Sequence, residues 1–186
     1  MFRLCVFCGS RSGIDPVYAD QKRLLGAAMA ARGIGLVFGA GHIGLMGVLA
    51  DAVRDHGGET IGVIPQTLVE RELAHQSLTD LRVVESMHDR KALMAGLSDA
   101  FLALPGGYGT LDETFEILTW AQLRLHHKPI GMLNVAGFFD PLLAWIDRAI
   151  ADDFVKPKNR ELLMVENDVD RILDRIMSAG GAGERL

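Results

Sequence analysis

The stretch from Pro105 to Glu113 carries the residues of this chain that are best suited to chemistry. Its sequence is Pro-Gly-Gly-Tyr-Gly-Thr-Leu-Asp-Glu, and it follows an apolar run at 100–104. Glycines allow the backbone to turn several N–H groups toward one point, and a helix that starts there attracts an anion to its first turn. The sequence has no Gly-x-x-x-x-Gly-Lys-[Ser/Thr] motif for a triphosphate. The stretch therefore predicts a binding site for a monophosphate.

The spacing of Thr110 and Glu113 has a structural and a chemical interpretation. The two residues form a capping box, in which their side chains satisfy the first amides of a helix. Alternatively, the Glu113 carboxylate faces a ribose and stabilises the positive charge that develops when the bond to the base breaks. A carboxylate that folds back onto the cap is less free to face a substrate, so the spacing leaves both interpretations open.

A pair of adjacent cations, Arg90 and Lys91, lies on a helix predicted over 86–97, with Ser86 as its cap. Neighbouring positions on a helix point about 100° apart, so one cation can face a pocket while the other reaches solvent. Ordinary surface charge is the alternative. A guanidinium in the pocket would bind phosphate or ribose and orient Glu113 through charge-assisted hydrogen bonds.

The segment from Gly39 to Gly44, Gly-Ala-Gly-His-Ile-Gly, matches the dinucleotide fingerprint and lies between a predicted strand and a predicted helix. A dinucleotide site also needs an acid at the end of the next strand. No Asp or Glu occurs from Thr60 to Val69, and Glu59 stands at the wrong end of that strand. The segment therefore predicts a contact with phosphate or ribose rather than with NAD. Close packing of strand and helix is the structural alternative.

Apolar runs and amphipathic patterns alternate along the whole chain, which predicts right-handed crossovers and a parallel sheet. The fold class is α/β, a single-domain Rossmann-like doubly wound parallel sheet with helices on both faces. Its ligands are expected at the carboxyl ends of the strands. We expect one nucleotide-binding domain over 1–179 and a flexible tail over 180–186. The predicted strands are 4–7, 36–38, 60–64, 82–84, 100–104, 130–133 and 162–165, and the helices are 16–31, 45–56, 86–97, 110–125, 141–151 and 168–177.

Composition excludes several classes of protein. Of the 186 residues, 49% are hydrophobic, and the net charge of −5 argues against nucleic-acid and membrane-surface partners. The chain has no apolar run long enough to span a bilayer and no signal peptide, so we expect a cytoplasmic protein. Cys5 and Cys8 end a predicted strand rather than open a helix, and further metal ligands at zinc spacing are missing. We therefore expect two core residues and no metal or other cofactor.

Four segments together resemble the LOG ("Lonely guy") family of cytokinin riboside 5'-monophosphate phosphoribohydrolases. The resemblance covers the chain from Phe2 to about Met177. It implies hydrolysis of N6-substituted adenosine 5'-monophosphates, and often of AMP, to the free base and ribose 5-phosphate. Ala40 departs from the family pattern, where a third glycine is common. The four segments are Cys8-Gly9-Ser10, the run Gly39 to Gly47, Met87-His88-Asp89-Arg90-Lys91, and the run Pro105 to Glu113.

The resemblance implies catalytic functions for Arg90 and Glu113. Asp112 and Glu116 are candidates for the acid that protonates the leaving base, only because they are close in sequence. With the glycine loops, the predicted substrate-binding residues are Gly9, Ser10, Gly41, Glu72, Met87, Arg90, Lys91, Gly106, Gly107, Tyr108, Gly109, Thr110, Glu113 and Thr119.

Two alternatives concern function, and one further expectation concerns assembly. A non-catalytic carrier or sensor of nucleotides would have the same phosphate loop, but it would not need Arg90 with Glu113. Some family members carry the label lysine decarboxylase. A pyridoxal phosphate enzyme needs a Schiff-base lysine with an acidic partner, and this chain is short and has few lysines.

The helix over 110–125 is apolar around much of its circumference, which predicts a homodimer.

Overall fold

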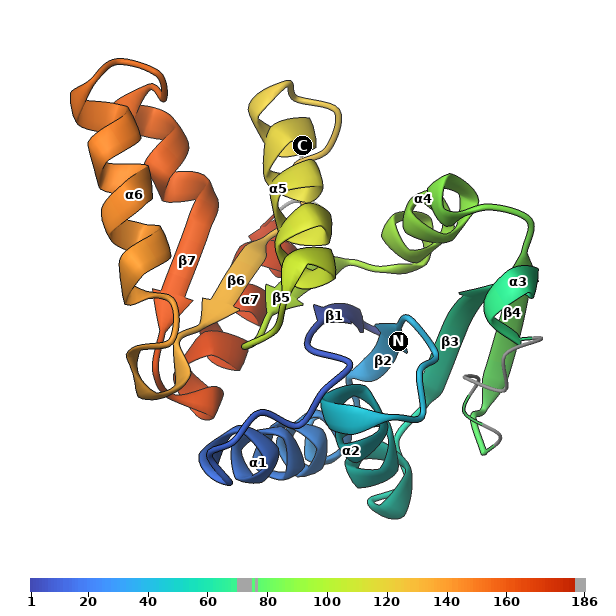
Figure 1. Ribbon diagram of the computed structural model, residues 1–186. Helices are drawn as coiled ribbons and strands as arrows, with labels where there is room; N and C mark the ends of the chain where they lie inside the picture. The colour runs from blue at the N-terminus through green and yellow to red at the C-terminus, as the bar shows by residue number, and fades with distance from the viewer. Residues whose placement is uncertain (70–74, 76, 183–186) are drawn as a thin grey trace.

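The computed structural model describes residues 1–69, 75 and 77–182. Seven strands form one parallel sheet in the order β4-β3-β2-β1-β5-β6-β7 (Figure 1). The predicted fold class is confirmed. The order reverses between β1 and β5, and in such sheets the crevice for a ligand opens at this switch point. The strands are β1 (Arg3–Phe7), β2 (Gly35–Phe38), β3 (Thr60–Pro65), β4 (Asp80–Val84), β5 (Ala100–Ala103), β6 (Ile130–Leu133) and β7 (Leu163–Glu166).

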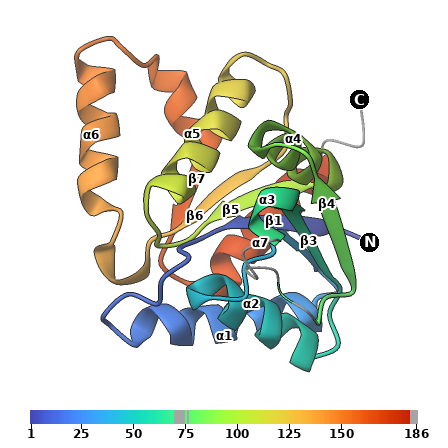
Figure 2. The same ribbon diagram turned by 45° about the vertical axis from the view of Figure 1, so that its right-hand side comes forward.

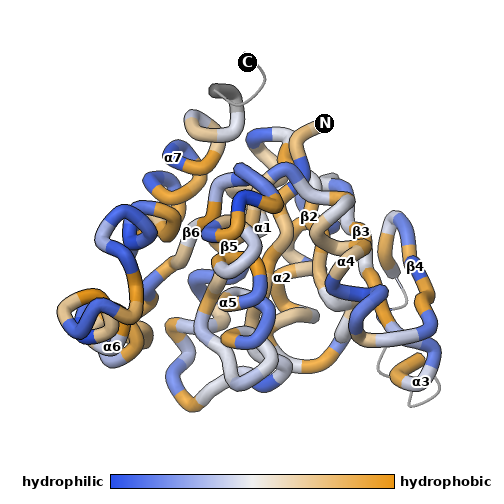
Figure 3. The backbone as a smooth tube through the Cα atoms, turned by 90° about the horizontal axis from the view of Figure 1, so that it is seen from above, coloured by the Kyte–Doolittle hydropathy of each residue, from blue (hydrophilic) through white to orange (hydrophobic). Residues whose placement is uncertain are grey.

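Helices cover both faces of the sheet (Figures 1 and 2). On one face lie α1 (Val17–Ala31), α2 (Gly44–Asp55) and α7 (Val169–Ala182), and on the other lie α4 (Met87–Leu97), α5 (Tyr108–Gln122) and α6 (Asp140–Ala151). Strand residues alternate between the two cores: Leu4 and Leu36 face the first layer, and Cys5 and Val37 face the second. Figure 3 shows α7 alternating between hydrophobic and hydrophilic residues, as a helix on the surface of a core does. The short elements are α3 (Gln66–Val69), η1 (Val135–Gly137) and η2 (Pro157–Leu162).

The buried face of α1 includes a charged residue. Leu24 is 52% exposed, whereas Lys22 is fully buried. The helix packs through Gly26, where a Cβ atom would lie 2.6 Å from the Cβ of Ala52 on α2. Lys22 lies one helical turn before Gly26, on the same buried face of the helix.

The last helix is longer than predicted, and the two cysteines are buried as predicted. Helix α7 continues to Ala182, past the predicted start of the tail at 180, and residues 183–186 lie outside the described part. Cys5 and Cys8 are buried free thiols, as predicted. Burial raises the pKa of the Cys8 thiol to about 11, so this thiol is not a nucleophile at neutral pH. Among the described residues, no helix is long and apolar enough to span a bilayer.

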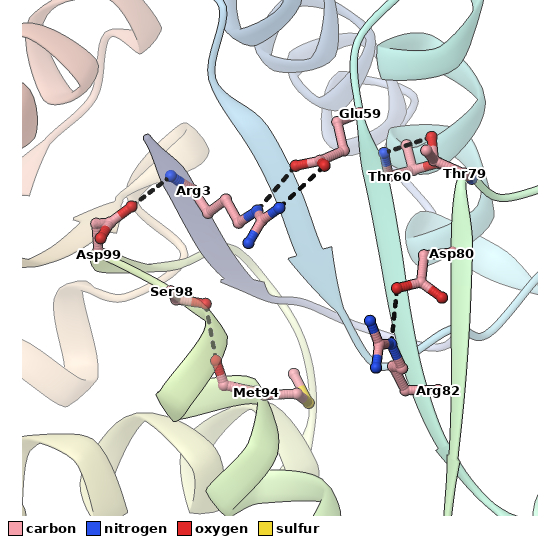
Figure 4. A network of polar contacts seen from close by, with 9 residues as sticks. All are labelled: Arg3, Glu59, Thr60, Thr79, Asp80, Arg82, Met94, Ser98 and Asp99. Carbon is pink, nitrogen blue, oxygen red and sulfur yellow. Dashed lines mark hydrogen bonds and ion pairs between the residues drawn. The ribbon is translucent and has the colours of Figure 1, made fainter. Parts of the chain in front are cut away.

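Polar side chains tie the amino ends of the strands together (Figure 4). Arg3 donates hydrogen bonds of 2.9 and 3.1 Å to the two carboxylate oxygens of Glu59, and its backbone N–H donates to Asp99 at 2.8 Å. Thr60 and Thr79 each donate a backbone N–H to the hydroxyl of the other. Glu59, which directly precedes β3, is therefore bound at the end of the sheet opposite the expected ligand edge.

Candidate active site

The switch point brings two of the three glycine loops into direct contact. The N–H of Leu104 donates to the carbonyl of Phe7 at 2.9 Å, and the N–H of Gly9 donates to the carbonyl of Pro105 at 3.1 Å. A Cβ atom on Gly9 would lie 3.2 Å from the Cα atom of Gly106. The ladder between β1 and β5 thus continues past the strands and fixes the loop after β1 against the phosphate loop.

The third loop, after β2, reaches the same place because of its backbone conformation. Gly44 has φ +66°, and a Cβ atom there would lie 2.3 Å from the carbonyl oxygen of Ser10, so only glycine fits. Ala40 is fully buried with φ 58°, and its carbonyl accepts a hydrogen bond of 2.8 Å from the N–H of His75. The extra methyl group at this family glycine is therefore accommodated.

A buried ion pair lies where these loops meet. The Nη1 atom of Arg90 donates to Oε1 of Glu113 at 3.0 Å, and its Nε atom donates to the carbonyl of Val63 at 3.1 Å. Both Arg90 and Glu113 are only 9% exposed. A Cβ atom on Gly39 would lie 1.7 Å from Nη2 of Arg90, so the guanidinium uses the space that this glycine leaves open. Residues from α4, α5 and the ends of β2 and β3 thus build one charged centre.

The geometry excludes the capping box. Helix α5 begins at Tyr108 with Gly107 as its N-cap, and no side chain caps it. Thr110 is already inside the helix, where its carbonyl accepts a hydrogen bond of 2.6 Å from the hydroxyl of Thr114. The capping interpretation of Thr110 and Glu113 is therefore wrong. The glycines let the helix start two residues earlier than the sequence pattern predicts, and the Glu113 side chain turns toward Arg90.

Lys91 binds α5 as well, instead of facing solvent. Its Nζ atom lies 3.2 Å from Oδ2 of Asp112 and 3.1 Å from Oε1 of Glu116. Burial lowers the pKa of Lys91, but the ion pairs with Glu116 and Asp112 outweigh that effect, and the pKa is raised overall. Asp112 and Glu116, the two residues close in sequence to Glu113, are thus both bound to a cation from α4.

Two cavities open on either side of Ser10 and Arg11, which line both of them. The first, which we term the Arg90 cavity, has a volume of about 380 Å³. The second, the α1 cavity, has a volume of about 230 Å³. The Arg90 cavity is further lined by Gly39, Gly41, Ile43, Met46, Ile64, Leu68 and Arg90, and the α1 cavity by Gly9, Gly13, Tyr18, Leu45, Pro105, Gly106, Gly107 and Phe138.

Burial and the charge of Arg90 have opposite effects on the pKa of Glu113. Burial has the larger effect. It raises the pKa of Glu113, because the charged form loses its hydration, and the nearby Arg90 lowers it again without cancelling the increase. The carboxyl group is therefore poised to exchange a proton closer to neutral pH than an exposed glutamate.

The predicted substrate-binding residues are not all in the cavities. Tyr108 and Gly109 are exposed in the first turn of α5, and Met87 is partly exposed in the first turn of α4. Thr119 lies further along α5 and lines a groove between α5 and α6. Glu72 lies outside the described residues. The residues that do line the two cavities are Gly9, Ser10, Gly41, Arg90, Gly106 and Gly107.

Sequence reasoning missed several residues of the site. Arg11, Tyr18 and Phe138 line a cavity, although none of them belongs to a recognised motif. Val63 contributes only its carbonyl, which no side-chain pattern reveals. Gly39 could be found from the sequence, because it opens the dinucleotide fingerprint, and in the structure it leaves room for the Arg90 guanidinium.

Comparison with known proteins decides the family. A family model described as "Possible lysine decarboxylase" matches residues 46–176. The cytokinin riboside 5'-monophosphate phosphoribohydrolase LOG3 of Arabidopsis thaliana is 46% identical over 184 residues, which cover 99% of this chain and 86% of that protein. The related LOG enzyme of Oryza sativa subsp. japonica is 49% identical over 162 residues, 87% of this chain and 67% of that protein. This chain belongs to the LOG family.

Solved structures of other proteins share the fold of this chain. The molybdenum cofactor binding protein of Rippkaea orientalis superposes with a TM-score of 0.72 at 20% identity, covering 95% of this chain and 96% of that one. The Moco carrier protein of Chlamydomonas reinhardtii gives 0.72 at 19% identity, with 97% and 98% covered. At this identity the likeness extends to the fold alone.

Gly39→Ala tests the arrangement of the ion pair. The new methyl group must displace the Arg90 guanidinium, which leaves Glu113 buried without its cation. We expect a loss of unfolding free energy on the order of 3 kcal/mol, as when one partner of a buried pair is removed. Denaturant unfolding measures the change. Gly96→Ala on α4, where a Cβ atom meets nothing within 4 Å, is the control and should not destabilise the protein. Equal stability of both variants would contradict the geometry.

Proposed function

We propose that this chain hydrolyses the N-glycosidic bond of adenosine 5'-monophosphates, N6-substituted ones included, to the free base and ribose 5-phosphate. The observation that carries the proposal is the buried pair of Arg90 and Glu113 at the switch point, next to a cavity that can enclose a nucleoside. The names of its LOG relatives support the same substrate class.

The proposed reaction uses the carboxylate of Glu113 at the sugar. Its Oε1 atom accepts the hydrogen bond from Arg90, and its Oε2 atom is the one that would face the sugar. The bond between the anomeric carbon and the base breaks, and the base keeps the electron pair and takes up a proton. Glu113 stabilises the oxocarbenium-like sugar and accepts a proton from the water that attacks the anomeric carbon. Arg90 keeps the carboxylate ionised and oriented.

The phosphate contributes binding energy at a distance from the reacting bond. The loop before α5 and the first turn of that helix offer backbone N–H groups and the positive end of the helix dipole. Binding energy from this remote group positions the anomeric carbon against Glu113.

Two other functions fit the site less well. A carrier or sensor of nucleotides needs the phosphate loop but gains nothing from a buried carboxylate whose burial is unfavourable. A lysine decarboxylase needs a lysine to bind its cofactor. Among the described residues no lysine lines either cavity, and Lys91 is engaged with Asp112 and Glu116.

Glu113→Gln separates a catalyst from a carrier. The amide has nearly the same shape and can still accept the hydrogen bond from Arg90, but it lacks the negative charge. We expect turnover of AMP to fall by a factor of at least about 100, with AMP affinity nearly unchanged. Chromatography of the products and calorimetric titration measure the two quantities. Turnover like that of the wild type would refute the mechanism, and an inactive wild type that binds AMP would favour the carrier.

The pH dependence of kcat/KM is the second test. Glu113 must be ionised, and its raised pKa places the loss of activity on the acid side at a higher pH than an ordinary carboxyl gives. Arg90→Met removes the charge that lowers this pKa, so the residual activity should be lost at a still higher pH. Arg23→Met, which breaks an exposed ion pair with Asp20, is the control and should keep the wild-type profile. An acid limb that stays in place or moves to lower pH in Arg90→Met would count against Glu113 as the titrating group.

We also propose a homodimer that buries the groove between α5 and α6. This groove has a volume of about 180 Å³, and Phe115 contacts Trp145 across it with ring centroids 6.0 Å apart. Large apolar side chains stay exposed around it: Trp145 by 56%, Leu123 by 61% and Phe154 by 85%. Light scattering should give twice the chain mass at micromolar concentration, and Trp145→Glu should give the monomer. A wild-type monomer would contradict the proposal, whereas Arg148→Glu on an exposed turn of α6 should stay dimeric.

A further inference from the structure

Lys22 is a buried cation that neither the fold nor the proposed reaction explains. It is fully buried on α1, and within the described part of the chain its Nζ atom is the buried side-chain polar atom without a hydrogen-bond partner. Buried polar groups are almost always paired, so an unpaired amine calls for a partner that comes from outside the chain.

Two neighbours of Lys22, one on α1 and one after β1, connect it to the α1 cavity. Tyr18, one helical turn earlier on the same face of α1, lines that cavity. The Lys22 amine and the Cys8 thiol affect each other electrostatically, and Cys8 directly precedes Gly9, another lining residue. Lys22 does not itself line the cavity, but these two relations place the amine close to residues that do.

Among the residues that the structure describes, no acidic group compensates Lys22. The elements that pack most extensively on α1 are α2, α7, η1 and β2, and Cys8 is the described titratable group that acts on the amine. Burial lowers the pKa of Lys22, because the ammonium loses its hydration. Folding is therefore opposed at neutral pH, and the opposition disappears only as the pH rises above the ordinary range of a lysine. A residue that destabilises the free protein is a candidate for a function in the bound one.

We propose that the α1 cavity receives the 5'-phosphate of the substrate and that Lys22 takes up a proton from solvent when the phosphate binds. This inference rests on the proposed function for the identity of the ligand. An oxyanion above Gly9 and Gly106 favours the ammonium form of an amine below it, and Arg11 supplies a second cation at the mouth of the cavity. The Arg90 cavity, on the other side of Ser10, is then left for the nucleoside, with Glu113 at the ribose.

Calorimetric titration in buffers of different ionisation enthalpy tests the proposal. The experiment uses the full chain with Glu113→Gln, so that AMP stays intact, and compares AMP with adenosine from neutral to alkaline pH. We expect AMP to bind with net proton uptake and adenosine without it. Adding Lys22→Met should abolish the uptake and reduce the preference for AMP over adenosine by about tenfold, because the buried ammonium and the phosphate attract each other in a poorly hydrated place. Lys156→Met, an exposed lysine, is the control and should change neither quantity.

The melting temperatures of the Lys22 variants without ligand show whether the variants fold and whether the buried amine costs stability. Lys22→Met should melt a few degrees higher than the parent without ligand, because it removes the unpaired amine, and Lys22→Gln serves as a second variant if Met perturbs the helix. Proton uptake that survives in the folded variants, or a preference for AMP as large as that of the parent, would overturn the inference. The proposed function is judged separately, by product formation in the wild type. Binding with proton uptake but no product would refute the reaction and leave the assignment of Lys22 intact.

Discussion

The ion pair between Arg90 and Glu113 is the interaction on which the rest of the site depends. The guanidinium needs open space above Gly39, a carbonyl from Val63 and a carboxylate from α5, and each comes from a different crossover of the sheet. Because the pair is buried, breaking it costs several kcal/mol, whereas an exposed pair such as Arg23 with Asp20 contributes about 1 kcal/mol or less. The ion pair therefore holds α4, α5 and the loop after β2 in fixed positions relative to one another.

The opposite effects of burial and charge suit Glu113 to a cationic transition state. Burial alone would favour the neutral acid, and Arg90 restores much of the ionised form. A carboxylate in a poorly hydrated place interacts more strongly with a developing positive charge than one in water does. The same logic applies to Lys22 with the sign reversed, since an incoming oxyanion would supply the charge that the protein itself does not.

The fold could be predicted from the sequence because its strands are short apolar runs separated by amphipathic helices, such as 100–104 before α5. The main charged pair could also be predicted, since Arg90 and Glu113 lie in specific motifs. Thr110 with Glu113 was ambiguous, because a capping box and a catalytic carboxylate share one spacing. Lys22 could not be found, since its burial depends on the close contact at Gly26 between α1 and α2, and that contact is a property of the packing.

Polar groups at the two edges of the sheet are satisfied to different degrees. At the amino edge Arg3 binds Glu59, and Thr60 binds Thr79, so the polar side chains there are paired. At the carboxyl edge Ala40 has a positive φ and Lys22 has no partner. Strain and unpaired groups of this kind cost stability and persist where the surrounding structure compensates for them. The amino edge thus supplies stability, and the carboxyl edge keeps unsatisfied groups available for a ligand.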